Sequence, residues 1–340
     1  MKLPDKISLG FIAVITGAVL LIPAPATIND ATYGVVAIIP SQDSGLNGVG
    51  SGFFVAENKI VTNAHVVGIL DGKPGHLEIL MKDTYQTYPI EVVGRDDLAD
   101  LAVVKLSDSD WQKFKKEQRY EILKMNNDDS NIKQGDKVIA IGHPQGLMWS
   151  VSEGIVSGTQ RDRADYSTNM ARPMIQTDAG VFPGNSGGPL IDVKTGKVIA
   201  VNEMLQSMQG GGTYTFSIPA EWTMRIINDL TDEDKVVKWS TLGMQLEFGK
   251  NGEVIAGEVD KDKPAGLAGI EKGDVLVSAQ YGSDTTKILK PENILQFLGY
   301  IPAGETMSLI VHRGNEKKEF KIKTLGKLSS DYKERLPTNK

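Results

Sequence analysis

The 340-residue sequence contains no cysteine. The fold therefore cannot depend on disulfide bonds, and both a cysteine protease and a thiolate metal site are excluded. Histidine is scarce as well, with four copies, and no cluster has the spacing of metal ligands, so we expect no metal and no other cofactor. Acidic residues outnumber basic ones by 43 to 37, and the net charge of −6 argues against a nucleic-acid partner.

A nucleotide-binding motif is also lacking. The glycine-rich stretch 208–212 has neither the lysine nor the strand-to-helix context of a phosphate-binding loop, and it predicts a flexible hairpin tip. This absence favours a reaction that does not use ATP.

One long apolar run is present, at residues 7–22, behind Lys2 and Lys6. Ala24 and Ala26 follow it in the spacing of a small-residue cleavage site, which favours a signal peptide over residues 1–26. The alternative is an uncleaved anchor in the inner membrane, although the run is shorter than the about 20 apolar residues of a membrane span. Either interpretation predicts an exported protein, in the bacterial periplasm or another extracytoplasmic space.

The most informative segment is GNSGGP at residues 184–189. Glycines on both sides of Ser186 allow a sharp turn and a close approach of a substrate. The amides of Gly184 and Ser186 can then point at one spot, where a carbonyl oxygen would become an oxyanion. The segment predicts a serine nucleophile with an oxyanion hole, and the alternative interpretation is an ordinary turn.

Two further segments supply partners for this serine. A serine hydroxyl needs a neighbouring base, and the base needs a carboxylate that orients it. His65 follows an apolar strand and opens a short turn, and Asp100 directly precedes another apolar run. The chain order His65, Asp100, Ser186 is that of the chymotrypsin-type triad. Asp96 and Asp97 compete with Asp100 for the third role, but they have the pattern of loop charges.

The other histidines have weaker claims. His76 lies in a turn pattern and is expected to be solvated, and His312 falls in a C-terminal strand pattern. His143 precedes a proline in a loop, where a structural or an exposed role is favoured. Asp178, shortly before the nucleophile, is expected to be a structural carboxylate of the turn.

Four motifs together resemble one known family, the HtrA (Deg) serine proteases. They are TNAHVV around His65, DLAVVKL after residue 99, AIGHPQG around His143, and TDAGVFPGNSGGPL around Ser186. The resemblance runs from about residue 48 to about residue 324. It implies a mostly β protein, with two six-stranded trypsin-like β-barrels followed by a C-terminal α+β PDZ domain. The triad would lie in the cleft between the barrels.

The local patterns agree with a mostly β first part. Short β-branched runs separated by turn residues predict strands at 34–39, 52–55, 59–62, 77–81, 90–93, 101–106, 137–141, 197–201 and 213–218. A helix is expected to open at Pro219 and run to about Leu230. The domain boundaries that follow are 1–26 for the targeting segment, 27–222 for the protease domain, 223–237 for a helix and linker, 238–326 for the PDZ domain and 327–340 for a charged, disordered tail.

Two signatures in the last third resemble a PDZ domain. Thr241, Leu242, Gly243 and Met244 match the carboxylate-binding loop, and the stretch 263–277 follows in the expected order. Residues 291–298 would form the helix beside the peptide groove. Such a module binds a C-terminal peptide by adding it as a strand. The alternative for the first signature is an ordinary strand entry.

The residues before the nucleophile predict the specificity pocket. Gly180, Val181 and Phe182 line it by resemblance, and none of them is acidic. A basic substrate side chain would have no partner there, and a buried unpaired charge is costly, so we expect a preference for small or medium apolar residues. Phe182 stands where the family pattern has asparagine, which leaves the size of the pocket open.

The resemblance also implies regulation and assembly. Arg161 matches the family's arginine that passes a signal from the PDZ side, and the alternative is a solvated loop arginine. The family assembles as trimers, so a homotrimer is expected. The predicted function is an exported, ATP-independent serine endopeptidase that cleaves unfolded or signalling polypeptides through an acyl-enzyme. The rival hypotheses are a chaperone or peptide-binding protein in which proteolysis is secondary, and a membrane-anchored protease with one dedicated substrate.

Overall fold

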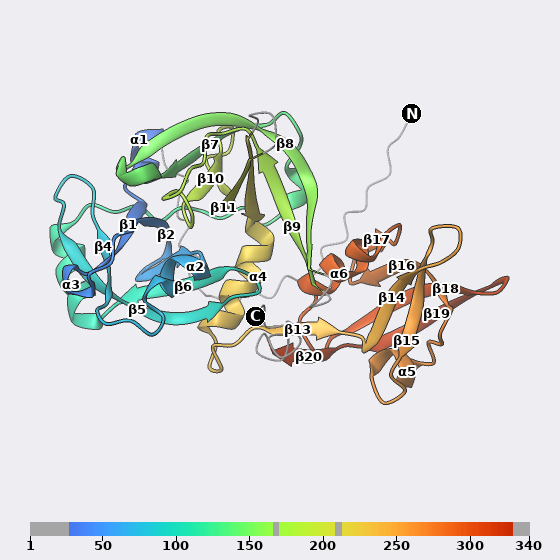
Figure 1. Ribbon diagram of the computed structural model, residues 1–340. Coiled ribbons are helices and arrows are strands. Elements are labelled where there is room, and N and C mark those ends of the chain that lie inside the picture. Colours follow the sequence, from blue (N-terminus) through green and yellow to red (C-terminus); the bar gives the residue numbers. More distant parts are fainter. Residues whose placement is uncertain (1–26, 166–169, 208–212, 329–340) are drawn as a thin grey trace, which may run out of the picture.

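The computed structural model describes residues 27–165, 170–207 and 213–328 (Figure 1). The expected targeting segment, the glycine-rich stretch 208–212 and residues 329–340 of the expected tail lie outside these ranges. Within the described ranges, no helix is both long enough and apolar enough to cross a membrane.

The first six strands close into a barrel in the order β1-β2-β3-β6-β5-β4. Its strands are β1 (Val35–Pro40), β2 (Gly50–Ala56), β3 (Lys59–Thr62), β4 (Leu77–Leu80), β5 (Thr87–Asp96) and β6 (Leu101–Leu106). Three helices decorate it: α1 (Ile28–Thr32), α2 (Ala64–Val67) and α3 (Asp108–Glu117). The six predicted strands of this region are confirmed, because their β-branched side chains fill a barrel interior.

The second barrel closes in the order β10-β11-β12-β9-β8-β7. Its strands are β7 (Lys137–Gly142), β8 (Ser150–Asp165), β9 (Met170–Thr177), β10 (Pro189–Asp192), β11 (Val198–Ser207) and β12 (Thr213–Pro219). The sequence did not predict β8, β9 or β10. Glycine, proline and charged residues interrupt their patterns, and they form strands because barrel closure gives each one a hydrogen-bonded neighbour on both sides.

Alternating side chains serve two cores in each barrel. Phe54 points into the first barrel, where it meets the rings of Trp111 and Phe114 from α3. Its neighbour Phe53 points the opposite way, into a core that also contains Ile141 of the second barrel. This alternation follows from the two-residue period of a strand. The shared core therefore fixes one barrel against the other.

A separate α+β domain follows the barrels (Figure 1). One sheet has the order β14-β15-β16-β18-β19, with β17 beside β16, and β13 pairs with β20. Its elements are β13 (Lys238–Thr241), β14 (Met244–Phe248), β15 (Val254–Val259), α5 (Pro264–Ala268), β16 (Val275–Tyr281), β17 (Asp284–Lys287), α6 (Pro291–Tyr300), β18 (Thr306–Arg313), β19 (Glu316–Lys323) and β20 (Leu325–Leu328). The predicted fold class is confirmed. Lys327 and Leu328, predicted to lie in the tail, instead belong to β20, because β13 pairs with them.

Helix α4 (Ala220–Thr231) joins the two parts of the molecule. The predicted boundary at residue 222 falls inside this helix. Trp222 is fully buried, and its ring lies 5.5 Å from that of Trp239 in β13 and 5.1 Å from that of Tyr300 in α6. One aromatic side chain thus contacts the barrels' core and the C-terminal domain at once.

The contact between α4 and α6 requires a glycine at position 299. A Cβ atom placed there would lie 2.0 Å from the ring of Trp222, which is buried and cannot move aside. We therefore expect Gly299→Ala to destabilise the protein by about 1–3 kcal/mol through overpacking, measured by thermal unfolding. Gly326→Ala is the control, because its nearest neighbour is the side chain of Ala303 at 3.1 Å. Equal melting temperatures for Gly299→Ala and the wild type would contradict this packing.

The side chains of Asp129 and Glu221 lie close together next to Trp222, where α4 contacts α6. The amide of Asp129 donates to Glu221, and the amide of Glu221 donates back to Asp129. Burial, and then the charge of Glu221, raise the pKa of Asp129 to about 7. Burial, with the charges of both acids, also raises the pKa of Tyr300 in α6. The junction of the two parts therefore holds a carboxyl group that the fold favours in its neutral form.

This environment predicts a pH-dependent stability. Because the pKa of Asp129 is raised by folding, the native state binds the extra proton between about pH 4 and pH 7, and stability falls as the pH rises through that window. Asp129→Asn removes the loss, so we expect the variant to gain on the wild type by the order of 1 kcal/mol, about 2–4 °C, at pH 8 and much less at pH 5. Melting curves at both pH values provide the test, with exposed Asp108→Asn as the control. A gain that is the same at both pH values would contradict it.

Candidate active site

The structure brings His65 and Asp100 together at the edge of the first barrel. His65 lies in α2, directly after β3, and Asp100 ends the turn between β5 and β6. The imidazole Nδ1 lies 2.9 Å from Oδ2 and 3.0 Å from Oδ1 of Asp100, and the His65 amide donates to the same carboxylate at 3.0 Å. The carboxylate therefore fixes both the ring and the backbone of His65.

The turn that carries Asp100 is held in an unusual conformation. Asp100 has φ +53°, in the left-handed region that costs most residues energy but that aspartate tolerates. Asn63 donates to its carbonyl oxygen at 2.9 Å. Asp96, expected to be a loop charge, is instead buried and accepts a hydrogen bond from the Ala99 amide at 2.7 Å. It is a structural acceptor of this turn, whereas Asp97 forms an ion pair with Arg95.

The nucleophile segment forms a tight turn between β9 and β10. The Asn185 amide donates to the Phe182 carbonyl at 2.9 Å, and Gly184 has φ +107°. A Cβ at Gly184 would lie 2.2 Å from the His143 carbonyl oxygen. Within the described residues, neither the Gly184 amide nor the Ser186 amide donates to a protein acceptor. Both are thus available to an incoming oxygen.

Ser51 of β2 attaches this turn to the first barrel. Its amide donates to the Ser186 carbonyl at 2.8 Å, and its hydroxyl donates to the Gly184 carbonyl at 2.7 Å. Nδ1 of His143 lies 2.9 Å from the same hydroxyl. His143 is fully buried, burial lowers its pKa to about 3, and its ring is therefore neutral, with Nδ1–H as the donor to Ser51. Of the two roles considered for His143, structural or exposed, the structure shows the structural one.

The Ser186 hydroxyl has a backbone acceptor as its partner. It donates to the Glu203 carbonyl of β11 at 3.0 Å, and among the described residues no hydrogen bond joins it to His65. Such contacts are often unmade in the absence of a substrate.

The charge of His65 responds to its neighbours. The hydrogen bond with Asp100 is the main cause that raises its pKa above the usual 6.5, and the charges of Asp100 and Glu203 add to this effect. Burial and Arg172 act in the opposite direction. The imidazole side chain is 51% exposed, so an incoming group can reach it. An imidazole in this setting can take up a proton and be stabilised as the cation.

The three predicted pocket residues lie side by side before the turn. The Gly180 carbonyl accepts a hydrogen bond from Ser152 at 2.8 Å, and Val181 is buried. Phe182 is 47% exposed, and its ring would lie 3.3 Å from a Cβ at Gly180. A phenyl ring therefore covers the place where a larger side chain at position 180 would stand.

Among the described residues, the remaining predicted residues make no hydrogen bond or ion pair with His65 and have partners or surroundings of their own. Asp178 accepts a hydrogen bond from the Ile155 amide at 2.7 Å, which is the structural role expected of it. Arg161 of β8 is exposed and donates to Gln176 of β9 at 2.9 Å. His76 contacts Glu78 at 3.2 Å, and His312 is exposed on β18.

A groove crosses the C-terminal domain beside the predicted carboxylate-binding loop. Its volume is about 1490 Å³, and its lining includes all four predicted residues, Thr241, Leu242, Gly243 and Met244. Leu295 and Leu298 of α6 line it as well. Gly243 has φ +70°, and Lys263 lies directly over it. The groove lining combines apolar side chains with charged residues of both signs.

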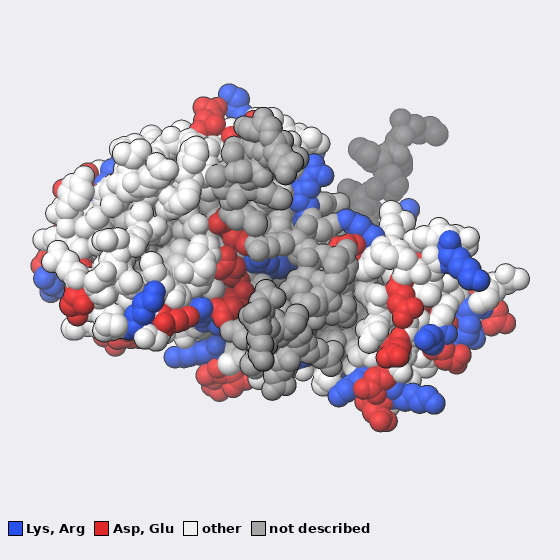
Figure 2. Space-filling view, viewed as in Figure 1, with Lys and Arg blue, Asp and Glu red and all other residues white. Residues whose placement is uncertain are grey.

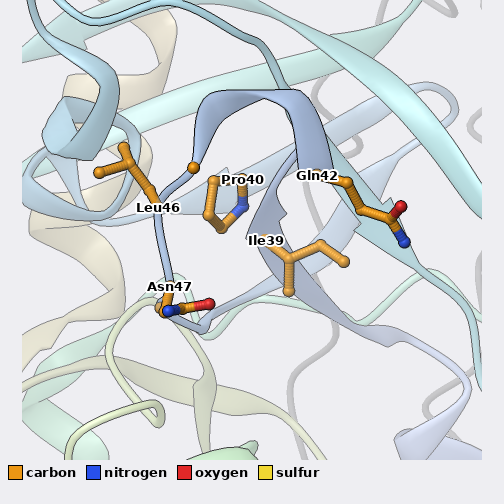
Figure 3. A pocket seen from close by; sticks show the side chains of 7 residues that line it. Ile39, Pro40, Gln42, Leu46 and Asn47 are labelled. Carbon is orange, nitrogen blue, oxygen red and sulfur yellow. The ribbon is translucent and has the colours of Figure 1, made fainter.

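A smaller cavity of about 350 Å³ lies at the end of β1 (Figure 3). Ile39, Pro40 and Gln42 line it together with Leu46 and Asn47 of the short loop that follows. None of the predicted catalytic residues lines this cavity.

On the face drawn in Figure 2, acidic and basic side chains are intermixed.

Sequence reasoning missed the residues that surround the catalytic candidates. Arg172 of β9 donates to the Ala99 carbonyl at 2.8 Å and to the Glu203 carboxylate at 2.9 Å. Both charged side chains are buried, with 8% and 5% exposed. The one available signal was a charged residue beside each of two apolar runs, at 172 and at 203. Ser51 gave no signal, because its role depends on the packing of the two barrels.

Comparison with known proteins gives a consistent result. The trypsin-like peptidase domain family matches residues 50–201. A DegP-like periplasmic serine endoprotease of Bartonella henselae is 32% identical over 286 residues, which cover 81% of this chain and 52% of the relative. Its counterpart in Brucella suis is 30% identical over 297 residues, which cover 83% and 53%. The chain thus spans about half the length of the curated relatives it matches.

Solved structures with a similar fold include the HtrA-type protease AlgW with a tripeptide. That structure has a TM-score of 0.68 and 23% identity, and the match covers 88% of this chain and 96% of that one. The serine endoprotease from Yersinia pestis has a TM-score of 0.62 at 23% identity, with the same coverage. These likenesses bear on the fold, which they share over both barrels and the C-terminal domain.

The nucleophile turn predicts a strong effect of Gly184→Ala. The new Cβ would collide with the His143 carbonyl, so the peptide must rotate and carry its amide away from the site. We expect the reaction of Ser186 with a fluorophosphonate probe to slow by about 10²–10³-fold, the cost of one lost oxyanion donor. Gly146→Ala is the matched control, because Gly146 also has a positive φ, +81°, but has open space around it. Equal rates for Gly184→Ala and Gly146→Ala would show that the Gly184 amide is not an oxyanion donor.

Proposed function

Since the chain belongs to the HtrA/Deg family of trypsin-fold proteases, we propose that it is a serine endopeptidase with Ser186 as nucleophile, His65 as general base and acid, and Asp100 as the group that orients His65. The observation that carries the proposal is the bidentate contact of His65 Nδ1 with the Asp100 carboxylate, at 2.9 and 3.0 Å. That contact fixes the tautomer in which Nε2 is free to accept a proton.

The reaction would proceed in two halves. Ser186 rotates from the Glu203 carbonyl toward His65, gives its proton to Nε2 and attacks the peptide carbonyl carbon. The amides of Gly184 and Ser186 hold the resulting oxyanion, and the C–N bond breaks as His65 returns the proton to the leaving amine. Water then attacks the acyl-enzyme with His65 again as the base, and Ser186 recovers its proton.

Substrates would be unfolded or partly folded polypeptides, or a signalling polypeptide, and cleavage would need no ATP. A preference for small or medium apolar residues before the cut is supported by the uncharged Gly180, Val181 and Phe182. The exposed Phe182 ring next to Gly180 favours the smaller side chains.

The C-terminal domain would bind the carboxyl ends of peptides. A ligand added as a strand could place its terminal carboxylate on the backbone amides of Thr241, Leu242, Gly243 and Met244. Lys263 also lines the groove. The apolar wall formed by Leu295 and Leu298 suits an apolar last residue.

We also propose a location and an assembly state for the chain. Those named as periplasmic proteases support an extracytoplasmic location, to which residues 1–26 would direct the chain. A homotrimer and a regulatory role of Arg161 belong to the same proposal. A chaperone or peptide-binding protein, with proteolysis secondary, is the competing function.

Degradation of casein without ATP, followed on gels, tests the proposal directly. Wild type and Ser186→Ala are compared side by side, and we expect fragments with the wild type alone. If neither protein cleaves, even when C-terminal peptides are added, the competing binding function is favoured. Equal cleavage by both proteins would show that Ser186 is not the nucleophile.

A further inference from the structure

We propose that Arg172 and Glu203 form a positioning pair that holds the turn of Asp100 and the strand facing Ser186 in their working arrangement, an inference that rests on the proposed function. Neither residue carries a motif of its own, and neither touches the place of the reacting carbonyl. Both act through the residues they hold.

Arg172 connects the two barrels at the site. It lies in β9 of the second barrel, and its Nη1 donates at 2.8 Å to the carbonyl of Ala99, the residue just before Asp100. The planar guanidinium offers a second donor in fixed geometry, and Nη2 reaches the Glu203 carboxylate at 2.9 Å. A single rigid group thus ties the Asp100 turn of one barrel to β11 of the other.

Glu203 adds the link to the nucleophile. Its carboxylate receives Arg172, and its own backbone carbonyl accepts the Ser186 hydroxyl at 3.0 Å. A shift of this residue would therefore move the acceptor of the serine and one end of the Arg172 bridge together. The backbone of Arg172 is itself held, because Gln296 of α6 donates to its carbonyl at 3.4 Å.

Because the pair is buried, its contribution to stability does not explain its presence. A buried ion pair gains little stability over apolar residues of similar size, because both charges lose their hydration. The benefit here is therefore fixed geometry, because one end of the pair bonds the residue before Asp100 and the other end carries the acceptor of the Ser186 hydroxyl. The charges also act on His65, whose pKa is raised by Glu203 and lowered by Arg172, so their effects partly cancel.

Charge-conserving variants separate position from charge. Arg172→Lys keeps the positive charge but loses the two-pronged geometry, and Glu203→Asp keeps the negative charge but withdraws the carboxylate by one methylene. Looser support of the Asp100 turn weakens the contact that raises the pKa of His65. We expect the pKa of His65 to fall toward 6.5 by about 0.5 unit or more in each variant, and the double variant to show no further fall because the two act as a unit.

Histidine NMR of the full-length chain measures this shift. The four histidines give four signals after ¹³Cε1 labelling, and the spectrum of His65→Gln identifies the one from His65. The signal of His143 serves as the internal reference for an intact fold, because that ring is fully buried and burial lowers its pKa to about 3. Around His65, the charged groups are Asp100, Glu203 and Arg172, with Arg95 and its partners Asp71 and Asp97 beside α2 at Gly68.

Arg313→Lys is the matched control. Arg313 of β18 also bridges a carboxylate, Asp274, and a backbone carbonyl, that of Gly269, but it lies in the C-terminal domain. The His65 curve should not move in this variant. An unchanged His65 curve in both Arg172→Lys and Glu203→Asp, or an equal shift in Arg313→Lys, would overturn the proposal. If Arg172→Lys fails to fold, Glu203→Asp alone decides.

Kinetics give a second readout. Displacement of catalytic groups lowers turnover more than binding, so kcat should fall by about 10- to 100-fold in both variants with KM within about twofold. A loss confined to KM would contradict a positioning role. This test is distinct from that of the proposed function. If Ser186→Ala still cleaves, the proposed function fails. The titration of His65 tests the positioning role of Arg172 and Glu203 without any cleavage assay.

Discussion

The contact between the two β-barrels is the constraint on which the site depends. Phe53 of the first barrel and Ile141 of the second meet in one buried core, which continues through Trp222 of α4. This packing brings Ser51 onto the turn of Ser186. Each barrel alone would hold an incomplete set of groups. A change that loosens the core between the barrels would therefore also disturb the geometry of the site.

The C-terminal domain is attached through the same core. Trp222 contacts Trp239 and Tyr300, so the helix that leaves the second barrel also receives α6. One face of α6 packs on α4 and β9, and residues Leu295 and Leu298 of the same helix line the groove. The same helix therefore belongs both to the interface with the second barrel and to the wall of the groove.

The sequence predicted the parts of the fold and site that have a local cause. The β-branched runs of the first barrel, the helix from Ala220 and the fold class are confirmed, because period and turn chemistry act over a few residues. Strands β8 and β9 were missed, since pairing around the barrel overrides their interrupted patterns. His65 and Asp100 stand beside apolar strands, which is why the sequence suggested them, and the structure brings their side chains into contact. Arg172 and Glu203 meet only after β9 and β11 have joined the barrel, and no local pattern reports that.

The bond between the Ser186 hydroxyl and the Glu203 carbonyl is a small obstacle to the proposed reaction. Rotating the side chain exchanges one hydrogen bond for another, and a single bond of this kind contributes only about 1 kcal/mol net. The turn is held far more firmly, by the Ser51 hydroxyl and amide and by a glycine against the His143 carbonyl. The Ser186 side chain can therefore rotate at small cost while the backbone of the turn stays fixed. The oxyanion donors are then already in place when a substrate binds.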